Sequence, residues 1–414
     1  MKLKDTLPWT SFLLIAFALT TSLPSHPACA ADQEQAKPGL ISESKLNLNF
    51  RYRYEFVGQD GFAKDAYAST LRTRLAYRSP YFSNFGFLIE FDDVRSIGND
   101  LYNSTRNGNT NRPVVADPEG TEVNQALILY RGIENTVIRA GRRRITLDNH
   151  RFIGDVGWRQ NDQTYDGFSL SNMSLPEATI EYAYIDNVNR VFGPDSGTPS
   201  ADFKSDSHIL NIKHEWLLNW DVMAYAYLLD LEDSPLSSNK TFGIRMIGSN
   251  AFSDRTSASY TMEYAHQENY GDNPNNYSAD YFLLEGTLTT AGVTGKLGYE
   301  VLEGDSVQAF QTPLGTLHAF QGWADKFLAT PSDGIEDLYF SIATKIRGAN
   351  ISLIYHRFNP EAGGPDYGSE WDLMIKKPFA ERYSMVLKYA NYDARSFATD
   401  TEKLWIMFSA KFGN

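Results

Sequence analysis

Two pairs of arginines near the start of the chain alternate with apolar residues. Arg51 and Arg53 share the polar phase of one alternating segment. Arg72 and Arg74 share the polar phase of the next. Successive side chains of a β-strand point to opposite faces, so each pair points the same way. Because a guanidinium binds a carboxylate through two parallel hydrogen bonds, such a face suits either an acidic ligand or acidic residues of the protein.

The two pairs are expected to meet across a hairpin that is symmetric about residues 62–63. The opposed residues are then Arg51 with Arg74 and Arg53 with Arg72. Like charges directly across a strand pair destabilise it, so carboxylates must offset them. Glu90 and Asp92 have the matching phase on the following segment. Two interpretations stay open, and both can hold: a charge network that stiffens the wall, and a basic ladder that attracts an anionic solute.

A longer cluster of charges lies at residues 139–166. Its members are Arg139, Arg142, Arg143, Arg144, Asp148, Arg151, Asp155, Arg159, Asp162 and Asp166. A loop with this many charges is too costly to place in lipid, so it lies outside a membrane or folds into an interior. Both signs of charge are present, and Phe152 and Trp158 are available for packing. These features favour a loop that folds inward and forms a constriction.

The longest connection, residues 305–336, carries apolar residues at mostly helical spacing. This spacing predicts a structured amphipathic lid or plug over one mouth; the alternative is a loop that packs on its neighbours at the rim. The candidate gate residues are Phe310, Leu317, Trp323, Asp325 and Lys326.

These residues are positioned by about eighteen segments with period-two alternation, the pattern of half-buried strands. The segments are 45–57, 67–78, 84–94, 121–131, 136–142, 163–171, 178–187, 207–217, 220–229, 240–248, 255–267, 278–289, 292–302, 337–347, 350–358, 369–377, 381–393 and 402–413. Their connections alternate between short and long, and Tyr or Trp flanks many of them. Short turns at one rim, long loops at the other and aromatic girdles are typical of outer-membrane barrels.

The predicted fold is therefore all-β, a transmembrane antiparallel up-and-down β-barrel with short periplasmic turns and long extracellular loops. A soluble sandwich or β-helix is the alternative. The 414 residues are 42% hydrophobic with a mean hydropathy of −0.39, which excludes a bundle of membrane helices. The net charge of −13 and the pI of about 5.1 argue against a general nucleic-acid binder.

The N-terminal residues have the organisation of a secretory signal peptide. Lys2 and Lys4 precede an apolar run that ends at Ala28-Cys29-Ala30. We expect residues 1–30 to be removed, 31–43 to form a short periplasmic segment, and 44–414 to form the barrel. A membrane anchor and a lipoprotein are the less favoured alternatives, because the run is short and the residues before Cys29 fit a lipobox poorly.

An enzyme and a metal site have weak support. A hydrolytic barrel needs a Ser–His pair oriented by a third polar group, and neither His150 nor His318 lies in such a motif. The single Cys excludes a disulfide framework and a Cys-based zinc cage. The Asn- and Asp-rich loop around Asp272 offers weak oxygen ligands for Ca²⁺, although a solvated loop is the favoured interpretation. No cofactor is expected.

Two long motifs resemble the alginate-export porin family. They are GRRRITLDNHRFIGDVGWRQNDQTYDGFSL at residues 141–170 and FQTPLGTLHAFQGWADKFLATPSDGIEDLY at residues 310–339. The resemblance extends over nearly the whole mature chain. It implies a mainly monomeric barrel of eighteen strands in a Gram-negative outer membrane, with an arginine-lined constriction for an anionic uronate polymer. By position, the residues carried over are Arg74, Arg142, Arg144, Arg151 and Arg159, with Asp148 and Asp166 as carboxylate partners. This chain lacks room for the long insertions of the polymer exporters.

We therefore expect a channel that passes an anionic solute, such as a uronate or another acidic saccharide. The alternatives are a general diffusion porin and, less favoured, a barrel hydrolase. The expected solute path comprises Arg51, Arg53, Arg72, Arg74, Glu90, Asp92, Arg142, Arg144, Asp148, Arg151, Arg159 and Asp166. Expected partners are outer-membrane lipid, lipopolysaccharide, the saccharide and the barrel-assembly machinery, with no nucleic acid.

Overall fold

The computed structural model describes residues 44–195, 197–217 and 219–413. These residues form eighteen strands and two short 3-10 turns. The strands are β1 (Lys45–Gln59), β2 (Ala66–Arg78), β3 (Phe85–Ser96), β4 (Gly120–Ile133), β5 (Thr136–Arg143), β6 (Thr164–Asn172), β7 (Ala178–Asn189), β8 (Asp202–Leu217), β9 (Trp220–Leu229), β10 (Asn239–Ser253), β11 (Thr256–Asn269), β12 (Ser278–Thr290), β13 (Val293–Leu302), β14 (Ile335–Ile346), β15 (Ala349–Asn359), β16 (Gly368–Phe379), β17 (Tyr383–Ala394) and β18 (Thr401–Gly413). The predicted signal peptide and the 31–43 segment lie outside the described residues.

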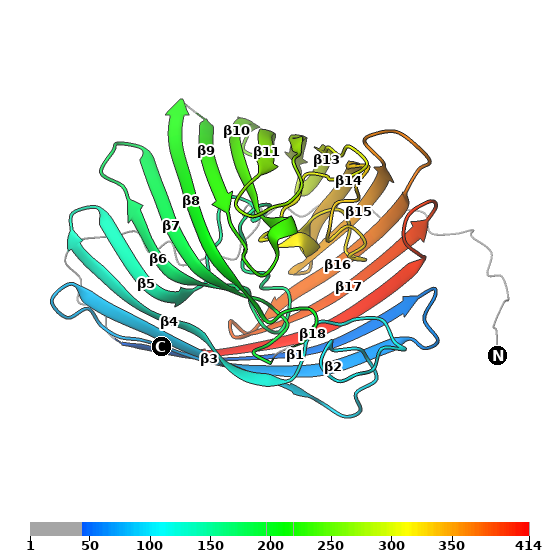
Figure 1. The fold of residues 1–414 in the computed structure, drawn as a ribbon, viewed down its shortest axis with the longest axis horizontal. Coiled ribbons are helices and arrows are strands. Elements are labelled where there is room, and N and C mark those ends of the chain that lie inside the picture. Colours follow the sequence, from blue (N-terminus) through cyan, green and yellow to red (C-terminus); the bar gives the residue numbers. More distant parts are fainter. Residues whose placement is uncertain (1–43, 196, 218, 414) are drawn as a thin grey trace.

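Each strand pairs antiparallel with its neighbours in the sequence, and β18 pairs with β1 to close the ring (Figure 1). Closure leaves no unpaired edge for lipid to meet. The predicted eighteen-strand up-and-down barrel is confirmed. The two 3-10 turns are η1 (Pro235–Ser237) and η2 (Leu317–Ala319). Within the described ranges, no helix has the length and apolar character needed to cross a membrane.

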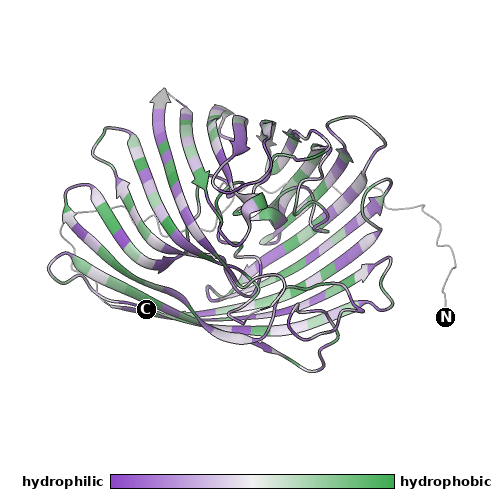
Figure 2. Ribbon diagram, in the orientation of Figure 1, coloured by the Kyte–Doolittle hydropathy of each residue, from purple (hydrophilic) through white to green (hydrophobic). Residues whose placement is uncertain are grey.

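The strands owe their two faces to the alternation in the sequence. Along β14, Leu338, Phe340 and Ile342 point outward and are exposed. Along β1, Arg53 and Glu55 point inward and are almost fully enclosed. Figure 2 shows the corresponding hydrophobic and hydrophilic bands that alternate along the strands. An exposed apolar outer face and a polar interior are what a barrel in lipid requires.

The connections differ between the two ends of the barrel. At one end, two-residue turns such as 291–292 and 347–348 join the strands, and both residues of each turn have positive φ. That conformation matches the twist of a hairpin. At the other end, the long loops 97–119, 144–163 and 303–334 turn back into the ring (Figure 1).

The register of β1 against β2 differs from the predicted one. Arg51 lies opposite Arg72, rather than opposite Arg74, and Arg53 lies opposite Thr70. The hairpin is centred one residue earlier than expected, between Gly61 and Phe62, and the φ of 93° at Gly61 suits a turn. A centre moved by one residue shifts every pair by two, so all side chains keep their predicted face.

Candidate functional site

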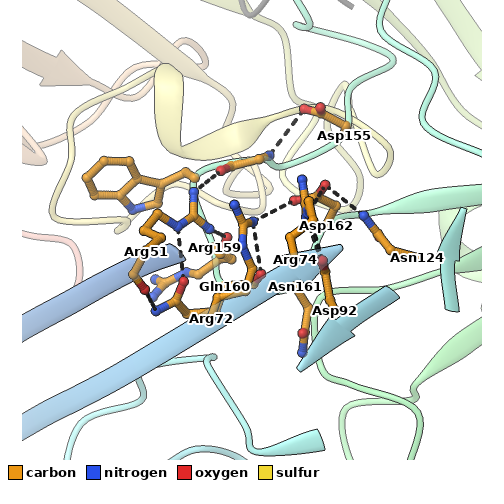
Figure 3. A network of polar contacts seen from close by, with 12 residues as sticks. Arg51, Arg72, Arg74, Asp92, Asn124, Asp155, Arg159, Gln160, Asn161 and Asp162 are labelled. Atoms are coloured by element: carbon orange, nitrogen blue, oxygen red, sulfur yellow. Dashed lines mark hydrogen bonds and ion pairs between the residues drawn. The ribbon is translucent and has the colours of Figure 1, made fainter. Parts of the chain in front are cut away.

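The loop 144–163 lies inside the barrel against β1 and β2. Arg51 donates to the backbone oxygen of Gly157 at 2.8 Å and to Oε1 of Gln160 at 3.0 Å. Arg53 donates to the backbone oxygen of Trp158, and Arg72 Nη1 donates to that of Gln160 at 3.2 Å. The wall arginines therefore bind the carbonyl groups of the loop, which forms a constriction beside them (Figure 3).

Asp162 of the same loop joins three arginines. Its Oδ2 accepts from Arg74 Nη2 at 2.7 Å and from Arg144 Nη1 at 3.2 Å, and its Oδ1 lies 3.6 Å from Arg72 Nη1. Burial acts to raise the pKa of Asp162, but the charges of its arginine neighbours outweigh burial and hold the pKa well below its usual value. Asp162 is therefore a permanent anion at the centre of this network (Figure 3).

Carboxylates of β3 complete the network, as the phase of the sequence suggested. Arg74 Nε donates to Asp92 Oδ1 at 2.7 Å, and Arg144 Nη2 donates to Glu90 Oε2 at 3.2 Å. Most of the arginine charge in this part of the wall is consequently matched by acidic groups. At the constriction, the arrangement is therefore that of an arginine–carboxylate network that stiffens the wall.

A third loop contributes an acid that sequence reasoning did not identify. Asp117, in the loop 97–119, accepts from the backbone N–H of Gln160 at 2.8 Å and lies 3.6 Å from Arg53 Nε. Burial acts to raise its pKa, but the charges of Arg53 and Arg159 prevail and lower it. No local pattern marks Asp117, because its partners lie more than forty residues away in the sequence.

The loops 144–163 and 303–334 are bound to each other by backbone contacts. Ile153 and Leu314 form a parallel β-bridge, and Gly154 N donates to Leu314 O at 2.9 Å. Thr316 N donates to His150 O at 2.9 Å. The approach is so close that a Cβ at Gly154 would lie 2.9 Å from the backbone nitrogen of Thr316. The two loops form one body across the interior.

Arg151 fastens this body to the wall. Its Nε donates to Glu300 Oε1 on β13 at 2.8 Å, and its Nη1 donates to Thr312 of the partner loop at 3.0 Å. The guanidinium carbon lies 4.8 Å from the ring centre of Phe320. Both members of the Arg151–Glu300 pair are buried. A single side chain thus joins one strand and two loops.

The tip of the loop 303–334 is held by a chain of polar contacts. His318 Nδ1 and Asp325 Oδ1 are 2.6 Å apart, and Lys388 Nζ lies 2.6 Å from His318 Nε2. Lys403 Nζ donates to Asp325 Oδ2 at 2.7 Å. Burial, with the charge of Lys388, holds the pKa of His318 well below its usual value despite Asp325. His318 is therefore neutral, and Asp325 is bound to the β18 wall by Lys403.

The helical spacing of the apolar residues in this loop does not produce a helix. Its only helical element among the described residues is the three-residue turn η2. The apolar side chains instead act as separate anchors, and Phe310 packs against Phe152 and Tyr281. Phe310 is fully enclosed and Trp323 is buried, so both face the protein, whereas Leu317 and Lys326 are only half-buried.

Two predicted path residues lie on the outer face of the wall. The register pairs Arg142 with Ala126 and Asp166. These positions share the phase of Ile128 and Phe168, which are exposed on the outside. Arg142 Nε donates to Asp166 Oδ1 at 2.7 Å. The two residues do pair, but the prediction that they line the interior is wrong, because strand alternation turns them outward.

Asp148 also departs from its predicted role. Its Oδ2 accepts from Asn211 Nδ2 at 2.7 Å. It forms no ion pair with the arginines of the cluster in the part of the chain that the structure describes. Arg159, by contrast, pairs with Glu55 at 3.2 Å and with Asp325 at 3.4 Å.

A further series of arginines lies on the inner face between the short turns and the constriction. Arg139 is paired in register with the buried Leu129 and Ser169, and Arg143 with the buried Tyr165. The series comprises Arg78, Arg131, Arg139 and Arg143. Electrostatic interactions connect Arg139 with Arg78, Arg131 and Glu181, and Arg143 with Arg139 and Glu181. None of these four arginines was among the predicted path residues.

A closed barrel with an apolar outer face and a charged, loop-constricted interior defines an outer-membrane channel. The chain belongs to the alginate export family, whose sequence profile matches residues 42–303. At the level of that family it is a channel rather than an enzyme, and it is located in the outer membrane of a Gram-negative cell. No curated protein has a significantly matching sequence.

Solved structures share the fold at low sequence identity. OccAB2 of Acinetobacter baumannii is 17% identical with a TM-score of 0.73, over 89% of this chain and 98% of that one. OpdK of Pseudomonas aeruginosa, crystallised with vanillate, is 14% identical with a TM-score of 0.72, over 91% of this chain and 100% of that one. OccK9 (OpdG) of the same organism is 14% identical with a TM-score of 0.73, over 91% and 100%. At these identities the likeness concerns the fold alone.

Proposed function

We propose that this channel passes small acidic solutes, of the uronate type, along one arginine-rich side of its interior. The observation that carries the proposal is the arginine series on the inner faces of β2, β4 and β5. Glu181 is the acidic neighbour of both Arg139 and Arg143 in that series. The series leads from the short-turn mouth to the Arg144 side of the constriction.

The charges suit conduction rather than tight binding. A permeating anion needs sites that are favourable but weak and repeated. At the constriction, Asp162, Asp92 and Glu90 reduce the field of the arginines. Towards the short turns, Arg139 and Arg143 share Glu181 as an acidic neighbour. An anion is attracted along the series and is not held at its narrowest point.

The comparisons support an acidic cargo, and the loops support a small one. The family is that of alginate export, and alginate is a polymer of uronates. The structural neighbour OpdK was crystallised with vanillate, a carboxylate. The two inward loops are joined to each other by backbone hydrogen bonds and to the wall by a buried ion pair. A polymer would have to displace this body, whereas a monomeric uronate need only pass beside it.

Reversal potentials in a salt gradient across a planar bilayer test the proposal. We expect an anion preference in the wild type. Arg139→Gln and Arg143→Gln should each lower the anion-to-cation permeability ratio about twofold, because each removes one charge from the path. Arg95→Gln is the matched control, since Arg95 is an exposed arginine paired with Asp93. Cation preference in the wild type, or an equal effect of Arg95→Gln, would overturn the proposal.

Competition separates this function from that of a general diffusion porin. A monomeric uronate in the bath should reduce the chloride current, because both anions use the same arginine series. A neutral hexose of the same size should leave that current unchanged. Equal reduction by the two sugars would favour an unselective porin.

The side chain of Lys326 should make the anion selectivity of the channel depend on pH. Burial, with the charge of Lys403, lowers the pKa of this half-buried lysine to about 8. Its charge is present below that pH and is lost above it. We expect the anion preference to decline between about pH 7 and pH 9. Lys326→Gln should abolish this step, and Lys326→Arg should keep a high preference throughout. A wild-type pH profile in Lys326→Gln would exclude Lys326 as its origin.

A further inference from the structure

A pocket of about 460 Å³ lies on the wall between the loops that follow β15 and β17. Its lining comprises Tyr355, Arg357, Pro365, Asp366, Gly368, Ser369, Arg395 and Ser396. The lining holds two guanidinium groups and one carboxylate. It is separate from the interior, from the constriction and from the arginine series of the proposed function.

Strand alternation places this pocket on the outer face of the barrel. Phe358 is fully enclosed, so its neighbour Arg357 points outward. Two residues closer to the short turns, Tyr355 packs against the exposed Trp371 in a tilted arrangement, with ring centroids 4.7 Å apart. Aromatic residues on the outer face mark the boundary between lipid and water. The two arginines therefore stand just above that boundary, at the end of the long loops.

Both arginines retain unused donors. Arg357 Nη2 contacts Asp366 at 3.3 Å, and Arg395 Nη2 contacts Asp393 at 3.3 Å. Their side chains are 57% and 66% exposed, respectively. A guanidinium has five N–H donors, and each of these two arginines uses only one nitrogen in its ion pair. The remaining N–H groups can meet a multivalent anion outside the barrel.

The anion found at this level of the outer leaflet is the phosphate of a phosphorylated glycolipid. We propose that the Arg357–Arg395 pocket binds a phosphate group of lipopolysaccharide. The guanidinium groups bind the phosphate oxygens, and the Tyr355–Trp371 pair lies beside the sugar and the start of the acyl chains. Planar forked donors match phosphate geometry, and aromatic rings suit the interface. This inference depends on the barrel lying in the outer membrane and is independent of which solute the channel passes.

Binding of defined lipopolysaccharide to the delipidated, refolded full chain in detergent tests this inference. The probe is a deep-rough lipopolysaccharide with both lipid A phosphates, and binding is measured by native mass spectrometry and titration calorimetry. We expect the double variant Arg357→Gln/Arg395→Gln to bind about tenfold or more weakly, because two charged contacts are lost. Arg95→Gln is the control, since Arg95 is an exposed arginine with an acidic partner and lies outside the pocket.

Two further binding measurements identify the source of the phosphate. Enzymatically dephosphorylated lipopolysaccharide should bind the wild type as weakly as the intact lipid binds the double variant. Inorganic phosphate should compete only at far higher concentration. The proposal would be overturned if a folded double variant, shown by heat-modifiable migration, bound lipopolysaccharide as tightly as the wild type does. It would also be overturned if inorganic phosphate bound the wild type as tightly as lipopolysaccharide does. Reversal potentials should be unchanged in the double variant, so this test can fail while the proposed function stands.

Discussion

Asp162→Ala will raise the single-channel conductance of this barrel severalfold. Asp162 is the loop carboxylate shared by Arg72, Arg74 and Arg144. Without it, three guanidinium groups repel one another around a loop that they now hold in place. Removal of one partner from a buried ion pair costs about 3–5 kcal/mol. We expect the loop 144–163 to leave the wall and widen the path.

The same substitution should increase the preference for anions, because the arginines lose a neutralising charge. Asp155→Asn is the matched control on this loop, since buried Asp155 accepts from Gly157 N at 3.1 Å and forms no ion pair in the described structure. Conductance traces of both variants in planar bilayers provide the measurement. Wild-type conductance in Asp162→Ala, with the barrel intact by heat modifiability, would show that the loop is held by other contacts.

Arg151→Ala will release both inward loops to proteases. Arg151 joins Glu300 of β13 to Thr312 of the loop 303–334. Its loss leaves a buried carboxylate without its cation, which costs about 3–5 kcal/mol. Tyr281 and Gln321 still donate to Glu300, so the β13 wall itself should persist. We expect faster cleavage within residues 144–163 and 303–334 while the barrel remains folded.

Limited proteolysis followed by mass spectrometry locates the cleavage sites. The electrophoretic migration of unheated samples shows whether the barrel remains folded. Arg151→Lys keeps the charge but loses the planar fork that reaches two partners at once. Its loops should be cleaved at an intermediate rate. Wild-type resistance in Arg151→Ala would mean that the β-bridge between Ile153 and Leu314 suffices to hold the two loops.

The strands were predictable because alternation is a local property. Period-two patterning located all eighteen strands of the described barrel to within a few residues. It also placed Arg51, Arg53, Arg72 and Arg74 on the inner face. The register of the first hairpin was not predictable to the same accuracy, because it depends on where the turn at Gly61 is centred.

The site was only partly predictable because its contacts link distant segments. Three consecutive arginines, 142–144, carry no alternation, so nothing local shows that Arg142 points outward. The spacing in the loop 303–334 resembled that of a helix, but its apolar residues fill separate places on the wall. Phe310, for example, meets Tyr281 of β12. Such contacts depend on the closed ring, which no single segment of the sequence describes.

The joined loops also have a mechanical consequence for the barrel. On one side Arg51 and Arg72 bind them to β1 and β2, and on the other Phe152 packs against Tyr225 of β9. These strands stand nearly opposite each other in a ring of eighteen. An empty ring of this size would flatten under lateral pressure from the bilayer, whereas a strut across its diameter resists that change of outline. The joined loops should therefore make the pore cross-section less sensitive to membrane tension.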